Sequence, residues 1–382
     1  MTITLTKEMQ QMKDMIGHFV EREVEPFAIQ IEEEDAIPEH LVEQAKNLGL
    51  FGISIPEQYG GIGLNTVGKA TVLEQLGRTH NGFVSLISAH TGIGSTGLVK
   101  LASEHLKEKY LPDMAAGTKI AAFALSEPGA GSDATNLATC AEKKGDCWVM
   151  NGTKHFITNG PIADVFTVFA LTDKSKGAKG GITAFLVERD FPGLTVGKKD
   201  KKMGLRGSYT SQVIFEDCII PEENVIGEVG MGYISALTIL GEGRVGLAAR
   251  AVGSCGKLIE LSAKYAKERI QFGKPIADNQ AIQWMLADMA TETEAARALT
   301  MMAAQKIDEG KKVIKEASMA KLFASDVFNR VADKAVQIHG GMGYMAEYPV
   351  ERFYRDARIT KIYEGTNEIQ RLIIARNVLE EC

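Results

Sequence analysis

The chain has 382 residues, of which 45% are hydrophobic and 24% charged, and its formal net charge is −6. This composition is typical of a globular protein with two or three structural units, and it excludes disordered, fibrous and membrane-spanning classes. A nucleic-acid partner is not expected, because a net negative chain without a broad basic face repels phosphates.

Residues 1–115 are predicted to form a helical domain. Apolar side chains recur on one helical face at Met12, Ile16, Phe19 and Val24, and the same period continues over residues 41–50. The first residues lack both the apolar core of a signal peptide and the Arg-rich bias of a transit peptide. We therefore expect a cytoplasmic, prokaryotic protein.

Residues 116–227 are predicted to form a β domain. Short apolar runs rich in Val, Ile, Phe and Thr alternate with Gly, Pro, Asn and Asp. The runs lie at residues 147–150, 165–171, 182–187 and 212–215. The pair Asn151-Gly152 predicts a hairpin turn. A basic cluster favours a solvated turn over a contact with an anionic substrate group, although both remain open. It comprises Lys198, Lys199, Lys201, Lys202 and Arg206.

Residues 228–382 are predicted to form a C-terminal helical bundle. Only two of the ten prolines lie there, which leaves room for long helices. Apolar residues step by three, four or seven from Ile282 through Met289 to Ala303, as a packed helix face requires. Such a bundle often buries further faces by forming oligomers.

Several short patterns carry little functional weight. Gly92-Ile-Gly94-Ser-Thr-Gly97 matches a dinucleotide-binding pattern, yet it lies in the helical domain without a preceding strand. The glycines at 340, 341 and 343 are interpreted as a turn between helices, and the neighbouring His339 as structural. The five cysteines, Cys382 among them, have neither the spacing of a zinc site nor that of a disulfide framework, so no metal is expected.

Three distant segments are more informative. Residues 123–133 leave a strand and enter a loop whose glycines expose backbone N–H groups to an approaching ligand. Residues 151–160 place an aromatic side chain close to a hydroxyl. Residues 363–368 lie between two helical stretches, where Thr366 can cap the last helix and leave Glu364 in an irregular loop.

On these segments and four others the chain resembles the acyl-CoA dehydrogenase family from end to end. The seven motifs occupy residues 124–133, 151–160, 203–208, 268–274, 337–341, 355–356 and 362–366. The resemblance implies an α+β chain with an N-terminal helical domain, a central β-barrel or sandwich domain and a C-terminal four-helix bundle. It also implies a homotetramer built as a dimer of dimers.

The resemblance implies that FAD lies extended between the β domain and the bundle, with a second subunit completing its site. Thr158 would hydrogen-bond near flavin N5, and Arg269 would oppose the pyrophosphate. The implied cofactor-binding residues are Phe123, Leu125, Ser126, Gly131, Ser132, Phe156, Ile157, Thr158, Arg269, Phe272, Gln280, Gln337, Gly341, Thr366 and Glu368.

In the family a carboxylate removes the α proton of an acyl thioester while the β hydrogen passes as hydride to flavin N5. The resemblance assigns this base to Glu364, whose backbone N–H, with a ribityl hydroxyl, holds the thioester oxygen. A carboxylate in an apolar pocket has a raised pKa and is a stronger base. The implied substrate contacts are Ser132, Gly241, Arg244, Tyr363 and Gly365.

Some relatives carry the base on a helix immediately before an arginine. Here that position is Gly243, which cannot act as a base, and Glu242 would point to another side of the helix. Many relatives have an acid where this chain has Gly241, which puts the contacts of residues 241–244 to the acyl-CoA in doubt. The residues around Met203 and Gly243 look like butyryl-type members.

We therefore expect a short-chain acyl-CoA dehydrogenase that passes its electrons to an electron-transfer flavoprotein in fatty acid β-oxidation. Two alternatives remain open at this point. One is the same chemistry run as an enoyl-CoA reductase, and the other is a branched-chain or aromatic-derived acyl-CoA substrate. The residues Leu86, Ile87, His90 and Ile93 line the acyl end or pack in the core.

Overall fold

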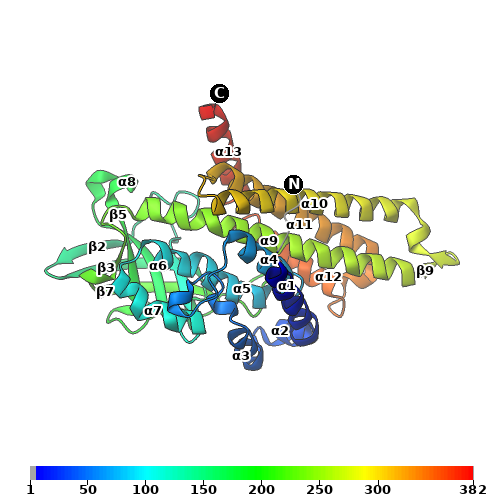
Figure 1. Cartoon of the computed structure of the whole chain (residues 1–382), viewed down its shortest axis with the longest axis horizontal. Helices are drawn as coiled ribbons and strands as arrows, with labels where there is room; N and C mark the ends of the chain where they lie inside the picture. Colours follow the sequence, from blue (N-terminus) through cyan, green and yellow to red (C-terminus); the bar gives the residue numbers. More distant parts are fainter. Residues whose placement is uncertain (1–5, 382) are drawn as a thin grey trace.

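A computed structural model describes residues 6–381 of the chain. Helices form both ends of the sequence and a sheet forms the middle, as predicted (Figure 1). The first residues and Cys382 lie outside the described range. No helix among residues 6–381 is long and apolar enough to cross a membrane.

The N-terminal helices pack beside the long C-terminal helices and share one core with them. Phe51 and Phe83 of the first part join Phe328 and Phe353 of the last part in this core. The helices are α1 (Lys7–Phe19), α2 (Ala28–Glu34), α3 (Glu39–Asn47), α4 (Thr66–Leu76), α5 (Asn81–Ala89), α6 (Ser95–Leu101) and α7 (Glu104–Ala116). The short helical segment η5 (His90–Gly94) joins α5 to α6 through non-helical backbone at Gly92.

The central part is an eight-stranded mixed sheet with the order β6-β7-β3-β2-β4-β5-β8, in which β1 pairs with β4 in parallel. The strands are β1 (Ala121–Ala124), β2 (Cys140–Lys144), β3 (Cys147–Thr158), β4 (Val165–Leu171), β5 (Ile182–Glu188), β6 (Leu194–Val196), β7 (Thr210–Pro221) and β8 (Val225–Ile226). Short α8 (Ala178–Gly181) precedes β5.

Both faces of this sheet are buried, which explains the nearly continuous apolar runs of β4 and β5. Phe169 and Leu186 face a core shared with α6, α7 and the start of the bundle. Phe166 and Phe185 face a second core that also receives Trp148 and Phe215 from β3 and β7. The period of two along each strand separates the two cores.

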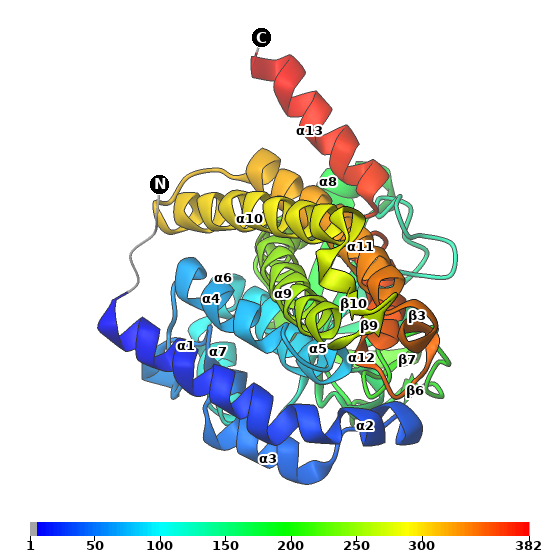
Figure 2. The same ribbon diagram turned by 90° about the vertical axis from the view of Figure 1, so that its right-hand side faces the viewer.

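The C-terminal part consists of long helices that run along the molecule, beside which α13 projects away from the body (Figures 1 and 2). The helices are α9 (Gly232–Glu268), α10 (Gln280–Asp308), α11 (Ile314–His339), α12 (Pro349–Ile359) and α13 (Asn367–Glu381), with a small hairpin of β9 (Ile270–Gln271) and β10 (Lys274–Pro275) after α9. The predicted apolar face of α10 is confirmed, since Met289, Ala296 and Ala303 are buried.

One local prediction is wrong. Asn151 and Gly152 do not form a hairpin turn but lie inside β3, where the register with β7 shifts between Met150 and Gly152. The pairing with β7 continues past them, and it prevails over the turn preference of the Asn-Gly pair. The turn before β3 lies instead at Gly145.

The basic cluster is not simply a solvated turn. Lys199 pairs with Asp35 at 2.8 Å, and Arg206 donates to the Glu32 carbonyl oxygen at 3.1 Å. Both partners lie in or just after α2. The cluster therefore fastens the segment between β6 and β7 to the N-terminal helices.

Candidate active site

Glu364 lies in the irregular segment between α12 and α13, as predicted. Its backbone adopts the left-handed region with φ of 55°, and Gly365 follows with φ of 90°. A non-glycine residue in this region is strained and persists only where the surroundings hold it. The backbone of this segment therefore fixes the direction of the Glu364 side chain.

Two buried residues hold this segment from outside it. Lys321 of α11 donates to the Gly365 carbonyl oxygen at 2.8 Å and to Asn367 Oδ1 at 2.9 Å. Gln370 of α13 donates to the carbonyl oxygens of Glu364 at 3.2 Å and Gly365 at 2.9 Å. Thr366 also contributes, because its Oγ1 accepts from the Ile369 N–H at 3.4 Å as the predicted helix cap.

The Glu364 carboxylate points against α9 at Gly243. A Cβ built on Gly243 would lie 2.7 Å from Glu364 Oε2 and 2.9 Å from Ile93 Cγ2. The position that carries the base in some relatives therefore adjoins the carboxylate that this chain supplies from its loop. Glu242 faces another side of α9, where it pairs with Lys100.

Glu364 Oε2 is buried and has no hydrogen-bond partner among residues 6–381. Burial raises the pKa of Glu364, and the cations Arg250, Lys321, Arg244 and Lys69 oppose that rise. A buried carboxylate oxygen without a donor is costly in free energy. Such a group is typical of a functional site, where it is available to accept a proton or to bind a ligand.

Arg250 of α9 links Tyr363, the residue before Glu364, to the N-terminal helices. It donates to the Tyr363 hydroxyl at 2.6 Å and to Ser88 Oγ of α5 at 2.8 Å. Arg250 is itself buried. The residue before Glu364 is thereby fixed to both helical parts of the chain.

The first two motif segments meet at the ends of β1 and β3. The His155 N–H donates to the Ser126 carbonyl oxygen at 2.8 Å. Below them, buried Lys154 donates to the Leu125 carbonyl oxygen at 3.1 Å and pairs with Glu127 at 2.7 Å. Burial lowers the pKa of Lys154 to about 8, while Glu127 opposes that fall. This buried pair fixes the backbone of the first motif.

Beside this junction the surface is open to a flat ligand. Phe156 is 65% exposed with φ of 58°, and its ring stacks on His155 at a centroid distance of 3.9 Å. Cβ atoms on Gly129 and Gly131 would meet nothing within 4 Å. Ser126 and Thr158 are half-buried here, whereas Ile157 is buried in the sheet core.

Other predicted cofactor residues lie elsewhere in the same chain. Arg269 and Gln280 are exposed around the β9–β10 hairpin at the far end of α9, and Phe272 is fully exposed there (Figure 1). Gln337 and Gly341 are also exposed. Within one chain, these residues therefore lie away from Phe123, Leu125 and Ser132, the predicted cofactor-binding residues of the β domain.

Some of the predicted substrate residues lie around Glu364, and others do not. Tyr363, Gly365 and buried Arg244 surround Glu364, and Arg244 donates to Ser318 Oγ at 3.3 Å. Open space adjoins Gly241. Among the residues proposed for the acyl end, Ile93 contacts the site. Buried His90 instead accepts from the Ala121 N–H, which is a structural role.

Sequence reasoning missed the basic residues around Glu364, namely Arg250, Lys321 and Lys69. Each lies in a helix among apolar neighbours, and this placement was the one available signal. His339 is structural as predicted, since it is buried and stacks on Tyr265 at 4.3 Å.

Sequence profiles of one family match nearly the whole chain. The acyl-CoA dehydrogenase N-terminal domain matches residues 6–118, the middle domain residues 122–218 and the C-terminal domain residues 230–379. An acyl-CoA dehydrogenase of Bacillus subtilis is 46% identical over 98% of this chain and 99% of its own length. The acryloyl-CoA reductase (NADH) of Anaerotignum propionicum is 45% identical over 100% and 96% of the two chains.

Solved structures agree with these matches. Butyryl-CoA dehydrogenase from Megasphaera elsdenii superposes with a TM-score of 0.96 and 41% identity, covering 99% of this chain and 100% of its own. An acyl-CoA dehydrogenase from Bacillus anthracis complexed with FAD has a TM-score of 0.92 and 39% identity, covering 99% of this chain and 67% of its own.

Proposed function

The chain belongs to the acyl-CoA dehydrogenase family, whose enzymes use FAD, and on that premise we propose that it dehydrogenates a short-chain acyl-CoA with Glu364 as the base. The product is the trans-2-enoyl-CoA. The observation that carries this proposal is the buried Oε2 of Glu364, which has no partner among residues 6–381.

The residues around the β1–β3 junction fit the cofactor. The exposed Phe156 ring and the open space beside Gly129 and Gly131 suit a flat aromatic ligand and its close approach to backbone N–H groups. Phe123, Leu125, Ser126 and Thr158 would hold it. When bound there, FAD supplies the acceptor for the β hydrogen and the electrons that the acyl chain loses.

Removal of the α proton needs a base and a stabiliser of the developing enolate charge. The Glu364 carboxylate supplies the base. The backbone N–H of Glu364 makes no hydrogen bond within residues 6–381 and is available to the thioester oxygen. Loop contacts from Lys321 and Gln370 hold both groups of one residue in place.

The short-chain assignment is supported by the likeness to butyryl-CoA dehydrogenase. The second candidate is the reverse reaction, reduction of an enoyl-CoA, which is supported by the 45% identity to an acryloyl-CoA reductase. A branched or aromatic-derived acyl group is a variant of the first candidate. The same residues serve all of these reactions.

We further propose that electrons leave to an electron-transfer flavoprotein, that four chains assemble as a dimer of dimers, and that the enzyme works in the cytoplasm. The tetramer is supported by the exposed Arg269, Phe272 and Gln280, which the resemblance assigns to the FAD site although they lie at the far end of α9 in one chain. Exposed Tyr344 and Leu379 are further apolar surfaces for contact between chains.

The experiment is an anaerobic screen of acyl-CoA chain lengths against the FAD-loaded enzyme, followed by bleaching of the flavin absorbance. We expect rapid bleaching by butyryl-CoA, and turnover when an artificial electron acceptor is added. Bleaching only by longer chains would contradict the short-chain assignment. Reoxidation of dithionite-reduced enzyme by crotonyl-CoA, compared in rate with bleaching by butyryl-CoA, measures the preferred direction.

A further inference from the structure

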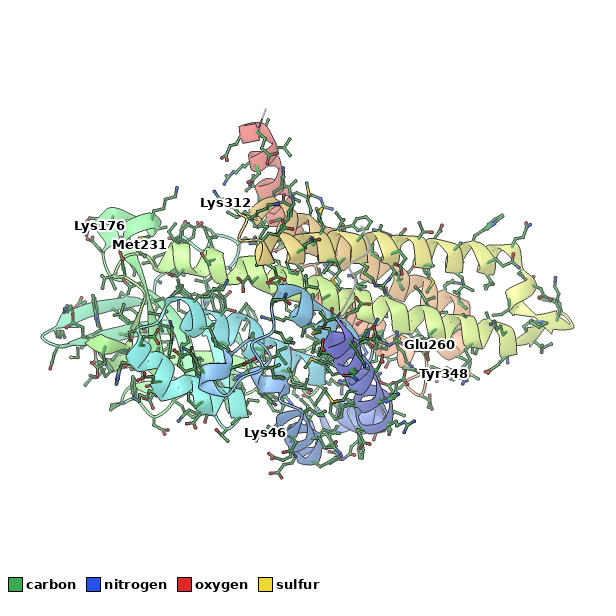
Figure 3. The ribbon with its side chains drawn as sticks, viewed as in Figure 1. Lys46, Lys176, Met231, Glu260, Lys312 and Tyr348 are labelled. Atoms are coloured by element: carbon green, nitrogen blue, oxygen red, sulfur yellow. The ribbon has the colours of Figure 1, made fainter. Side chains whose placement is uncertain are left out.

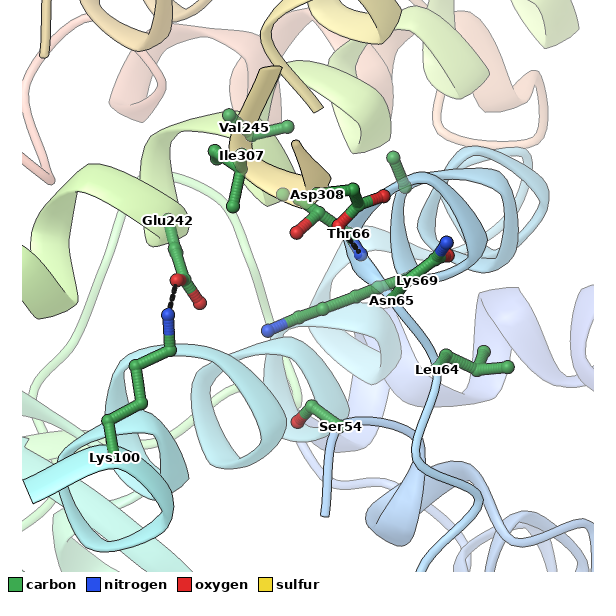
Figure 4. Close-up of a pocket in the computed structure, with 12 residues that line it drawn as sticks. Ser54, Leu64, Asn65, Thr66, Lys69, Lys100, Glu242, Val245, Ile307 and Asp308 are labelled. Carbon is green, nitrogen blue, oxygen red and sulfur yellow. Dashed lines mark hydrogen bonds and ion pairs between the residues drawn. The ribbon is translucent and has the colours of Figure 1, made fainter. Parts of the chain in front are cut away.

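A polar cavity of about 250 Å³ lies on the side of α9 next to the face that contacts Glu364. Residues from α4, α6, α9 and α10 line it (Figure 4). Its charged lining residues are Lys69, Lys100, Glu242 and Asp308. Neither the proposed base nor the open face at β1–β3 belongs to this lining.

Three of these four charged groups already have partners. Lys100 and Glu242 form an ion pair with each other. Asp308 accepts from the backbone N–H groups of Thr66 at 2.7 Å and Val67 at 3.0 Å, at the start of α4. A helix start is a favourable place for a carboxylate. The charges of these three groups are therefore already compensated within the protein.

Lys69 is different. Only 8% of the residue is exposed, and its Nζ points into the cavity (Figure 4). Its one hydrogen-bond acceptor among residues 6–381 is the Thr91 carbonyl oxygen at 3.1 Å, and no carboxylate there lies within ion-pair distance of it. An ammonium group has three donors, so two remain for a ligand. A buried cation without a counter-charge is costly.

Lys69 also interacts electrostatically with the proposed catalytic carboxylate. Its acceptor Thr91 lies two residues before Ile93, and a Cβ built on Gly243 would meet both Ile93 Cγ2 and Glu364 Oε2. On α9, Gly243 faces the carboxylate while Val245 and Gly246 line the cavity. The Lys69 and Glu364 charges interact, since each shifts the pKa of the other towards its charged form.

We infer that Lys69 is a specificity residue that binds a carboxylate at the far end of the acyl chain. The preferred substrate is then the CoA monothioester of a short dicarboxylic acid rather than a plain fatty acyl-CoA. The inference rests on the proposed function, and it narrows the acyl group that this function leaves open. The reaction is unchanged: the α proton goes to Glu364, and the β hydrogen and two electrons go to FAD.

The chemistry favours a carboxylate over other chain ends. A charged acceptor gains a charge-assisted hydrogen bond from an ammonium, whereas a terminal methyl group would leave the buried cation unpaired. A polar site built for one group rejects an analogue that lacks it, because its own groups are then left unsatisfied. Butyryl-CoA therefore becomes the poorer substrate.

The test measures kcat/KM of the FAD-loaded enzyme for butyryl-CoA and for the CoA monothioesters of four- to six-carbon dicarboxylic acids. For wild type, we expect one dicarboxylic thioester to exceed butyryl-CoA by about 10- to 100-fold, the value of one hydrogen bond to a charged group. In Lys69→Met this ratio should collapse to one or below. Lys176→Met removes a surface lysine at the far end of the β domain (Figure 3) and should keep the wild-type ratio.

A second readout is the pH dependence of the same ratio. Burial lowers the pKa of Lys69 to about 8, which Glu364 from the loop opposes and Lys100 from α6 reinforces. Glu242 from α9 and Asp308 from α10 also face the cavity. The wild-type ratio should be constant between about pH 6, where the free carboxyl group of the substrate is ionised, and pH 8, and it should fall above pH 8 as the ammonium loses its proton. In Lys69→Met the ratio should not change with pH.

Turnover of butyryl-CoA with no preference for any dicarboxylic thioester would overturn the inference and leave the proposed function intact. A parallel loss for both substrates in Lys69→Met would also overturn it, because Lys69 would then act through Glu364 or through folding. If Lys69→Met does not fold, Lys69→Gln takes its place. The ratio of kcat/KM for the dicarboxylic thioester to that for butyryl-CoA is then compared between Lys69→Gln and wild type. Failure of every thioester to bleach the flavin would refute the proposed function itself.

Discussion

At Glu364 the chain keeps a carboxylate where burial opposes its ionisation, within the influence of four cations that favour it. The carboxylate packs against α9 at Gly243, whereas the four cations lie on α4, α9 and α11. The raised pKa makes the carboxylate a stronger base, and the cations keep enough of it ionised to work. The balance, rather than burial alone, sets the pH range of the proposed reaction.

This balance predicts the acidic limb of the pH profile. Because Glu364 must be ionised to accept a proton, kcat/KM should rise with pH through a pKa above the ordinary carboxyl value of 4.5. Arg250 is the strongest of the four opposing cations, so Arg250→Gln should move this limb to higher pH. A pH profile of flavin bleaching measures it, and an unmoved limb would contradict the electrostatic role of Arg250.

At the scale of elements, the site depends on close approach between the 360–366 segment and α9. Gly243 permits that approach because it has no Cβ. The motif made Glu364 predictable from sequence. The surrounding Arg250, Lys321 and Lys69 were not, because basic residues in amphipathic helices are ordinarily exposed and only tertiary packing reveals their burial. The irregular pairing at Asn151 could not be predicted either, because it depends on the tertiary pairing of β3 with β7.

Gly243→Ala should displace the Glu364 carboxylate and lower kcat about 100-fold, the cost of a displacement of roughly 1 Å in a reacting group. Gly256→Ala on the same helix is the control, because its Cβ would meet only the flexible end of Arg78 at 3.3 Å. Rates of flavin bleaching compare the two variants. Equal rates in both would mean that the carboxylate does not need this contact.

The buried pair of Lys154 and Glu127 supports the backbone beside the proposed flavin site. Lys154→Met leaves the Glu127 carboxylate buried without its cation, which should destabilise the fold by about 3–5 kcal/mol. The double variant Lys154→Met with Glu127→Gln should recover part of that loss, because the charge is removed but one of the N–H groups of Ala138 and Thr139 loses its acceptor. Thermal unfolding measures the stability, and the FAD bound per chain measures the site; an unchanged melting temperature in the single variant would refute the argument.

At the scale of the whole molecule, the three-part arrangement could be predicted from the change in periodicity at both ends of the β domain. The direction of α13 could not, because a projecting helix leaves no distinct pattern in its own sequence. This helix stands away from the body with Leu372, Val378 and Leu379 exposed (Figure 2). Exposed apolar groups of this kind are typical of contact surfaces between chains.

If four chains assemble and share their FAD sites, a variant that loses contacts between chains should also lose bound FAD. Light scattering should give a mass four times that of the 41.4 kDa chain. Arg269→Gln with Phe272→Ala, at the far end of α9, should lower FAD retention although both residues are remote from Glu364 in one chain. A monomeric protein that retains FAD fully would contradict the shared site.

The central claim is that Glu364 removes the α proton, and Glu364→Gln tests it most directly because glutamine keeps the shape of the side chain without its basicity. Anaerobic mixing of the FAD-loaded variant with its best acyl-CoA should bleach the flavin at least about 100-fold more slowly than wild type. FAD content and binding of the enoyl-CoA product should be retained. Bleaching at the wild-type rate would show that another group takes the proton.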